Sequence, residues 1–512
     1  LGLEQVSLNQ TDQAKSHFSE ALDFLDQLKS IARSHPGIQQ QRCQTQSQLM
    51  QLNSPSSAWS LSGCDELLVL LPQNNDASLL AASAYTQVAE SWVIKGHEPN
   101  SILNHSRKII QRLSTMVSGE ALAKFEQILG QTYNTEGLWL LYSDQPFTHA
   151  FEQAQKHHEQ AAELMPADFN TRYELGMAWY HLATYSPYHP ERTDQQFNHV
   201  ETIFTALLDH ADANQALISS LVRVLTEHAY IKYQHGQPAD HLLLSAEGLV
   251  NQLLAQAEDN PFTHMAAATL YWTYGDYLAL QQINPDKYLA QAMAYFELVI
   301  ADNSMQWTHR YNQISAMLAA ITYYLNNDEP QTAELLSVKQ KLDILATRIA
   351  DEISLDSHLG YYHNMLAMDQ MLRNVNPTEA LRISNIHHQK CIKSPVDSAS
   401  CFAQLVTQMI IESRWKLKKL SHLMPQWDDR MAALKQAQAE NPENAILQAQ
   451  LGQLIYLNTR WQPGSKQSQL EQLLSAQQHL SFAIANNGLL ENRFKSALAA
   501  VNQAIDELSN SL

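Results

Sequence analysis

Hydrophobic side chains recur every three to four positions through most of this chain, which is the spacing of one face of an α-helix. Clear examples run over 14–31, 213–233, 265–280 and 432–438. No alternating run of β-branched residues stands out, and helix-breaking residues are scarce, with 15 glycines and 17 prolines in 512 residues. The pattern predicts about twenty helices, essentially no sheet, and therefore an all-α fold.

Helix breakers separate these segments at a regular interval. Pro261 and Ser304 lie 43 residues apart, Pro395 and Pro442 lie 47 apart, and Gly488 follows Pro442 by 46. A period of about 45 residues with two helices per unit is typical of a solenoid built from stacked helical hairpins. Because such units contact only their neighbours, we expect broad or multi-step unfolding.

Small residues recur at fixed offsets from these breaks. The pair Leu175-Gly176 follows Pro166 by nine and ten residues, and the pair Leu451-Gly452 follows Pro442 by the same offsets. The segment before Pro166 fits the second helix of such a unit, with the small residues Ala154 and Ala161 on either side of the large residue His158. This spacing resembles the tetratricopeptide repeat in a degenerate form.

The resemblance implies a right-handed superhelical solenoid of antiparallel helix pairs, with extended repeats. The units carry roughly ten residues more than the family pattern, so longer helices, extended turns or both must absorb them. We expect an N-terminal set of repeats over 1–115 and a main array over 116–512.

The first repeat lacks the beginning of its first helix. Leu1-Gly2 fits the middle of a first helix, and Ala14, Phe18 and Ala21 fit the second helix that follows. We therefore expect the chain to be a piece of a longer protein. The alternative is a degenerate first helix without a partner.

The charge balance argues against nucleic acid as a partner. The chain has 52 acidic and 33 basic side chains and a formal net charge of −19. Phosphate contacts need clustered lysine and arginine. No apolar stretch approaches the roughly 18 residues that span a bilayer, so we expect the chain not to cross a membrane itself.

The search for catalytic and metal-binding motifs is negative. The sequence at 464–466 (Gly-Ser-Lys) lacks the strand and the glycine that precede a phosphate-binding loop. Adjacent histidines at 157–158 and 387–388 point about 100° apart on a helix, so neither pair can hold a metal from one face. We expect no catalysis, no metal and no cofactor. The competing class is an enzyme or small-molecule sensor whose pocket is built from separate repeats.

The four cysteines fall into two pairs, each flanking a predicted turn. Cys43 and Cys64 flank a serine-rich loop, and Cys391 and Cys401 flank a short turn that contains proline. Residues equally distant from the turn of an antiparallel hairpin face each other, so either pair could form a disulfide. Two such pairs favour an oxidising, periplasmic or extracytoplasmic compartment over the cytoplasm. Buried free thiols are the alternative.

In the repeat that this chain resembles, the second, fifth, ninth and twelfth positions of each unit face the concave groove. The resulting candidates for partner binding are Asn170, Tyr173, Met177, Tyr180, Met265, Trp272, Gln453 and Tyr456. We expect Tyr173, Tyr180 and Trp272 to be partly exposed, and we expect burial between helices for Leu175, Gly176 and Trp179. Aromatic residues and methionine suit a peptide-binding surface. Lysine and arginine are absent from these positions, which disfavours the carboxylate-clamping groove of chaperone-tail binders.

These features predict a non-catalytic interaction scaffold whose concave groove holds a peptide or a partner helix. The stretches 14–22, 64–72 and 89–90 also resemble the repeat tails of bacterial Ser/Thr protein kinases. That resemblance implies an extracytoplasmic region behind a membrane anchor, although repeat tails of transcriptional regulators look similar. A purely structural oligomerisation module is a further alternative.

Overall fold

The structure is a computed structural model, and it is helical throughout the part of the chain that it describes. That part is residues 11–510 except 32–34, 54–59, 115, 187–188, 211–212, 257–259, 302–306, 351–352, 394–397, 420–426, 441 and 462–463. Within it lie 22 α-helices, one short 3-10 helix and no strand.

The helices are, in chain order, α2 (Thr11–Ile31), α3 (Pro36–Leu52), α4 (Ser62–Leu70), α5 (Asn75–Ile94), α6 (Asn100–Leu113), α7 (Glu120–Tyr142), α8 (Thr148–Leu164), α9 (Phe169–Tyr185), α10 (Pro190–Leu207), α11 (Gln215–Gln234), α12 (Asp240–Gln256), α13 (Pro261–Leu280), α14 (Asp286–Ala301), α15 (Trp307–Asn326), α16 (Thr332–Ala346), α17 (Asp356–Leu372), α18 (Thr378–Cys391), α19 (Ser398–Lys419), α20 (Trp427–Glu440), α21 (Ala445–Trp461), α22 (Lys466–Asn486), the 3-10 helix η1 (Gly488–Leu490) and α23 (Glu491–Ser509).

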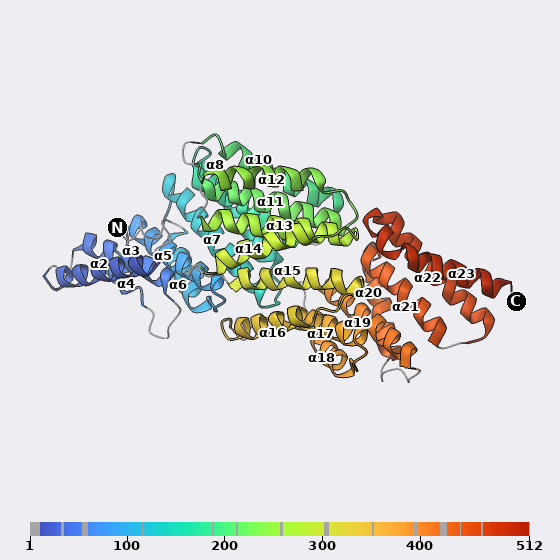
Figure 1. Cartoon of the computed structure of the whole chain (residues 1–512). Helices are drawn as coiled ribbons and strands as arrows, with labels where there is room; N and C mark the ends of the chain where they lie inside the picture. The colour runs from blue at the N-terminus through green and yellow to red at the C-terminus, as the bar shows by residue number, and fades with distance from the viewer. Residues whose placement is uncertain are drawn as a thin grey trace.

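Consecutive helices form antiparallel pairs, and the pairs stack into a solenoid (Figure 1). From α5 to α21, each odd-numbered helix packs against the even-numbered helix that follows it and against the next odd-numbered helix. We call these odd-numbered helices the first helices of their pairs, and their partners the second helices. The first helices α11, α13 and α15 begin at residues 215, 261 and 307, a spacing of 46 residues. The fold is therefore all-α and repetitive, with the predicted period.

Asparagine or aspartate caps many of the first helices at the predicted breaks. The Asn214 side-chain oxygen accepts a hydrogen bond from the Leu217 amide at 3.1 Å, and Asp168 accepts one from the Thr171 amide at 2.7 Å. The same role falls to Asn74, Asn260 and Asn444. Each cap satisfies an amide that has no partner inside its helix, so the breaks also define where the next helix begins.

Close approach within a pair depends on glycine. A Cβ atom at Gly176 of α9 would collide with the ring of Phe204 of α10, which is fully buried. Gly275 of α13 faces Leu289 of α14 in the same way.

The extra residues of each repeat lengthen the helices, since α13 has 20 residues and α14 has 16.

The solenoid contacts itself after five helix pairs, where α15 returns to α5. The Trp307 indole nitrogen donates to the Val93 carbonyl oxygen at 3.4 Å, across 214 residues of sequence. The Ala350 amide donates to the Gly96 carbonyl oxygen at 2.8 Å. Tyr142 of α7 meets the Trp307 ring edge to face, with ring centroids 5.0 Å apart. We call this contact the first seam.

A second seam joins the C-terminal helices to the middle of the chain, as the red and green helices of Figure 1 show. The Asn487 side-chain amide donates to the Tyr233 carbonyl oxygen at 3.4 Å, across 254 residues of sequence. The Asn492 side-chain amide donates to the Gln281 carbonyl oxygen at 3.2 Å. Because α23 comes five pairs after α13, both seams have the same repeat spacing.

Both cysteine pairs are joined by disulfide bonds in the structure. Cys43 of α3 is bonded to Cys64 of α4, with Cα atoms 4.5 Å apart. Cys391 at the end of α18 is bonded to Cys401 of α19, with Cα atoms 5.8 Å apart. The oxidising compartment that this pairing favours stays a prediction.

The helix α2 lies where the second helix of the first repeat was predicted. Ala14 and Phe18 are buried, and α2 packs against α3. Leu1-Gly2 lies outside the described residues. Both α5 and α6 contact α7, so helices on the two sides of the expected boundary pack together, and the division into 1–115 and 116–512 stays a prediction.

Candidate functional site

The predicted binding residues lie on three first helices. They are Asn170, Tyr173, Met177 and Tyr180 on α9, Met265 and Trp272 on α13, and Gln453 and Tyr456 on α21. Asn170 is exposed, whereas Met265, Trp272 and Tyr456 are half-buried against the large hydrophobic core of the middle repeats. The residues of α9 make the most specific contacts, and these contacts are with α11.

Arg223 of α11 contacts two of the predicted binding residues on α9. The Arg223 guanidinium donates to the Met177 sulfur at 3.2 Å, and its central carbon lies 4.8 Å from the centre of the Tyr180 ring. One turn earlier, the Tyr173 hydroxyl lies 2.8 Å from the Ser220 hydroxyl oxygen. Three of the four α9 residues are therefore in contact with the next first helix.

Three predictions of exposure are wrong. Tyr180 was expected to be partly exposed, but it is only 5% exposed, in part because Arg223 lies over its ring. Leu175 and Trp179 were expected to be buried, but both are half-buried. Neighbouring residues on a helix point about 100° apart, so the side of α9 that packs against α11 covers Tyr180 more completely than Trp179. Gly176 is buried as predicted.

Arg223 itself was missed, although the repeat pattern contained the signal. Met177 is the ninth residue of α9, counted from Phe169, and Arg223 is the ninth residue of α11, counted from Gln215. None of the predicted binding positions on α9, α13 and α21 is basic. The equivalent ninth position of α11 is basic, because Arg223 occupies it.

Three carboxyl groups lie on the first helices α5, α9 and α11, and none forms an ion pair with a described residue. Burial and, to a smaller extent, the nearby Glu90 carboxylate of α5 raise the pKa of Glu174 on α9 to about 7, and a hydrogen bond with Gln131 opposes this shift. Burial also raises the pKa of Glu90. On α11, burial raises the pKa of Glu227 to about 7, against the effect of Arg223 one turn away.

These groups are accessible to water. Glu90 and Arg223 have exposed side chains, and Glu174 and Glu227 are half-buried. Met177 and Tyr180 beside them occupy positions that the repeat pattern predicts to face the concave groove. We call the surface of the first helices that carries these residues the inner face.

Tyrosines complete the surroundings of Arg223. Burial raises the pKa of Tyr142 to about 12, and burial also raises the pKa of Tyr180 and Tyr185. All three are uncharged phenols at neutral pH, and they offer ring faces and hydroxyl groups. We define the inner-face site as Glu90, Tyr142, Glu174, Met177, Tyr180, Tyr185, Arg223 and Glu227.

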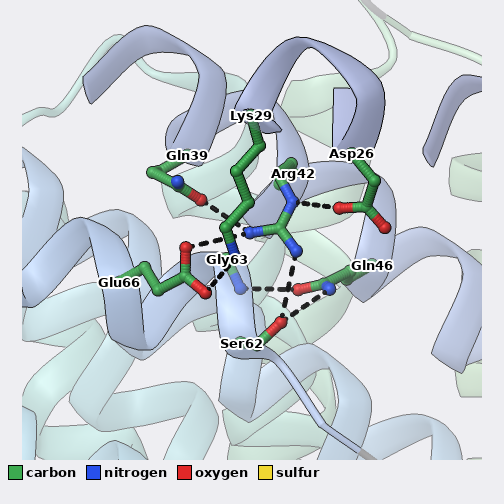
Figure 2. A network of polar contacts seen from close by, with 8 residues as sticks. All are labelled: Asp26, Lys29, Gln39, Arg42, Gln46, Ser62, Gly63 and Glu66. Carbon is green, nitrogen blue, oxygen red and sulfur yellow. Dashed lines mark hydrogen bonds and ion pairs between the residues drawn. The ribbon is translucent and has the colours of Figure 1, made fainter. Parts of the chain in front are cut away.

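A second polar cluster, between α2, α3 and α4, shows what a structural network in this chain looks like (Figure 2). Arg42 is buried and donates to Asp26 at 2.7 Å, to Gln39 at 2.7 Å and to Glu66 at 3.2 Å. Glu66 also accepts from Lys29. Charges of both signs are paired there, as a buried ion pair requires. The inner-face site differs because its carboxylates lack such partners.

The described residues show no arrangement for metal chemistry. They hold no group of three or more His, Cys, Asp or Glu side chains that could bind a metal ion. None of the described helices combines the length and the apolar character that crossing a bilayer requires. The chemistry that the inner-face site offers is binding, since carboxylates attract cations and tyrosine rings pack against aliphatic, aromatic and cationic groups.

Comparison with solved structures finds a likeness to the crystal structure of yeast Tom70. The TM-score is 0.37 and the sequence identity is 12%, over 98% of this chain and 97% of that chain. No protein-family model matches the chain, and no curated protein matches it.

Proposed function

We propose that this chain is a non-catalytic protein-interaction scaffold and that its inner-face site holds a segment of a partner protein. The observation that carries this proposal is a set of ionisable side chains on the first helices, with pKa values shifted by burial and without ion-pair partners in the described part of the chain. Enclosing a charge without a partner costs stability. A ligand that supplies the missing contacts is the simplest physical reason for the chain to keep them.

The site is suited to binding without rearrangement. Its side chains come from α5, α7, α9 and α11, which are held by their second helices and by their contacts with one another. Arg223 is already positioned by Met177 and Tyr180. A surface fixed in this way loses little conformational entropy when a partner binds, so more of the contact energy appears as affinity.

The other predicted contacts extend this proposal. Asn170 and Tyr173 continue the α9 surface, and the residues on α13 and α21 stay predicted contacts for a longer segment. The predicted relation to the repeat tails of signalling kinases gains no support from the Tom70 likeness, and it too stays a prediction.

A peptide selection tests the proposal. Random peptides displayed on phage are selected on the folded chain, and their dissociation constants are measured by fluorescence anisotropy. The Met177→Arg variant places bulk and charge on the inner face, and we expect it to weaken selected peptides at least about tenfold, which is about 1.4 kcal/mol. The matched control is Leu298→Arg, because Leu298 of α14 is 51% exposed on a second helix.

Circular dichroism melting of both variants shows that they fold. Equal weakening by the two variants, or none by Met177→Arg, would place binding elsewhere on the chain. A selection that enriches no peptide would reject peptide binding altogether.

A further inference from the structure

We infer that α23 is a docking surface for a second copy of this chain, and that the two α23 helices pair antiparallel. The surface lies outside the inner-face site, so the inference does not depend on the proposed function. It comes from an apolar face of α23 that is less covered than the same face of the preceding first helices, and from the charges beside that face.

The helix α23 occupies the repeat position of a first helix. Leu498 lies seven repeats of 46 residues after Gly176, and Ile505 lies five such repeats after Gly275. Gly176 and Gly275 are positions at which a first helix closely approaches the side chains of its own second helix. Leu498 and Ile505 therefore form the face of α23 to which a second helix would bind.

This face of α23 is incompletely covered. The two equivalent positions are buried in every first helix from α7 to α21, whereas Leu498 and Ile505 are only half-buried. The helix packs against α21 and α22 at the C-terminal end of the solenoid, and no second helix follows it in the described part of the chain (Figure 1). Covering the two apolar side chains with another helix would remove them from water, which is favourable.

Charges beside this face favour another α23 as the occupant. Lys495 and Asp506 are 11 residues apart, about three helical turns, so both project from the same edge of the face. Both side chains are exposed. In an antiparallel pair that places Leu498 of each copy against Ile505 of the other, Lys495 of each copy lies close to Asp506 of the other. One surface then supplies two apolar contacts and two ion pairs, as an isologous two-fold interface requires.

The charge of Asp506 is poorly compensated within its own helix. Asp506 lies in the last turn of α23, where the helix dipole disfavours a carboxylate and where there is no basic residue. It forms no ion pair with a described residue. Lys495 pairs with Glu491 of the same helix at 3.9 Å, and both of these side chains are more than half exposed. A lysine from a second copy would offset the negative end of the helix dipole.

Sedimentation equilibrium of the full chain measures the association. We expect an equilibrium between one and two chain masses of 57.9 kDa. The dissociation constant should be about 10 μM, because a single pair of helices buries a small interface. A mass that stays at one chain up to about 200 μM would overturn the inference. A trimer or a larger assembly would also overturn it, because an isologous pair closes at two copies.

Charge reversal tests the antiparallel arrangement. Lys495→Glu and Asp506→Lys each place like charges side by side at both ends of the pair, so each should weaken dimerisation at least about tenfold. When the two variants are mixed, every such contact again joins opposite charges, and heterodimers should form with nearly the affinity of the unmodified chain. Sedimentation velocity with a fluorescent label on one variant detects them. The double variant Lys495→Glu/Asp506→Lys should dimerise like the unmodified chain.

The matched control is Lys156→Glu, which reverses an exposed lysine on the second helix α8 and changes the net charge as Lys495→Glu does. Because the reversed side chains are exposed, all variants should melt like the unmodified chain by circular dichroism. Equal weakening by Lys156→Glu and Lys495→Glu would mean general charge repulsion, and would overturn the assignment to α23. Failure of the mixed variants to associate would overturn the antiparallel pairing.

Discussion

Within the inner-face site, Glu174 and Glu227 are carboxylates whose charge changes near neutral pH. Burial raises the pKa of each to about 7, so both are largely protonated at pH 6 and largely ionised at pH 8. The groups around them keep their charge over this range. Arg223 stays cationic, the tyrosines of the inner-face site stay neutral, and burial lowers the pKa of His181 to about 3, which keeps it neutral. Burial also raises the pKa of Glu90, as it raises the pKa values of Glu174 and Glu227.

Buried histidines make the fold sensitive to acid. His158 is fully buried, neither of its ring nitrogens has a hydrogen-bond partner among the described residues, and burial lowers its pKa to about 3. In the unfolded chain its pKa returns to about 6.5. Between these values only the unfolded chain binds the proton, so the free energy of unfolding falls as the pH drops below about 6.5. Burial lowers the pKa of His309, His358 and His363 in the same direction.

Replacing His158 with methionine should reduce this loss. The melting temperature of the unmodified chain should be lower at pH 5 than at pH 7, and the difference should shrink in His158→Met. Glu174 and Glu227 act in the opposite direction, because the folded chain keeps their protons up to about pH 7. Circular dichroism melts at both pH values measure the balance. An equal drop in the two proteins would show that His158 does not contribute.

At the scale of helices, the contact between α9 and α10 depends on one small and one large residue. Gly176 leaves the space that the ring of Phe204 fills, and Phe204 is fully buried. The same arrangement pairs Gly275 with Leu289. Because each pair is held together mainly by such packing, loss of the large partner leaves a cavity that the helices cannot close.

The Phe204→Ala variant should lose about 3–5 kcal/mol of stability, from lost burial and the cavity together. Phe262, which is 57% exposed, provides the control, and Phe262→Ala should stay within about 0.5 kcal/mol of the unmodified chain. Urea denaturation followed by circular dichroism measures both. A small effect of Phe204→Ala would mean that α9 and α10 are not held by this contact.

The disulfides are a second feature at this scale, since each joins two neighbouring helices. In protein isolated from its own compartment, we expect thiol titration under denaturing conditions to detect no free thiol before reduction and all four after it. Four free thiols before reduction would reject both the bonds in the cell and the oxidising compartment.

At the scale of the whole molecule, the two seams couple the stability of repeats that are distant in sequence. Units that contact only their neighbours unfold in steps, which is what the repeat pattern predicted. The structure adds one hydrogen bond across 214 residues of sequence and another across 254 residues. It also packs Trp307 against Tyr142. Repeats that are distant in sequence are therefore coupled, and we expect unfolding to be more cooperative than in an open array.

The Trp307→Ala variant tests this coupling. Trp307 is 7% exposed, and its removal should cost about 3–5 kcal/mol at the first seam. Hydrogen exchange should show faster opening of both α15 and the end of α5, although they are far apart in sequence. Exchange that quickens in α15 alone would mean that the seam carries no coupling. Leu298→Ala, on the exposed side of α14, should change neither helix.

The sequence by itself determined the features that depend on short stretches of chain. Helix content follows from hydrophobic spacing, the period follows from breakers such as Pro261 and from caps such as Asn214, and the tight helix pairs follow from glycines such as Gly176. Each of these is a local preference, so a residue and its near neighbours are enough to predict it. The same repeat spacing indicates the position of Arg223, because it is the ninth residue of α11.

Only the tertiary structure decided how the solenoid closes and what its inner face presents. Small rotations accumulate from pair to pair, and their sum brings Trp307 to Val93 and Asn487 to Tyr233. The packing of α9 against α11 likewise decides that Tyr180 is buried and that its neighbour Trp179 is half-buried. The raised pKa values of Glu174 and Glu227 depend on protein that surrounds them from several helices, and no single stretch of sequence contains that information.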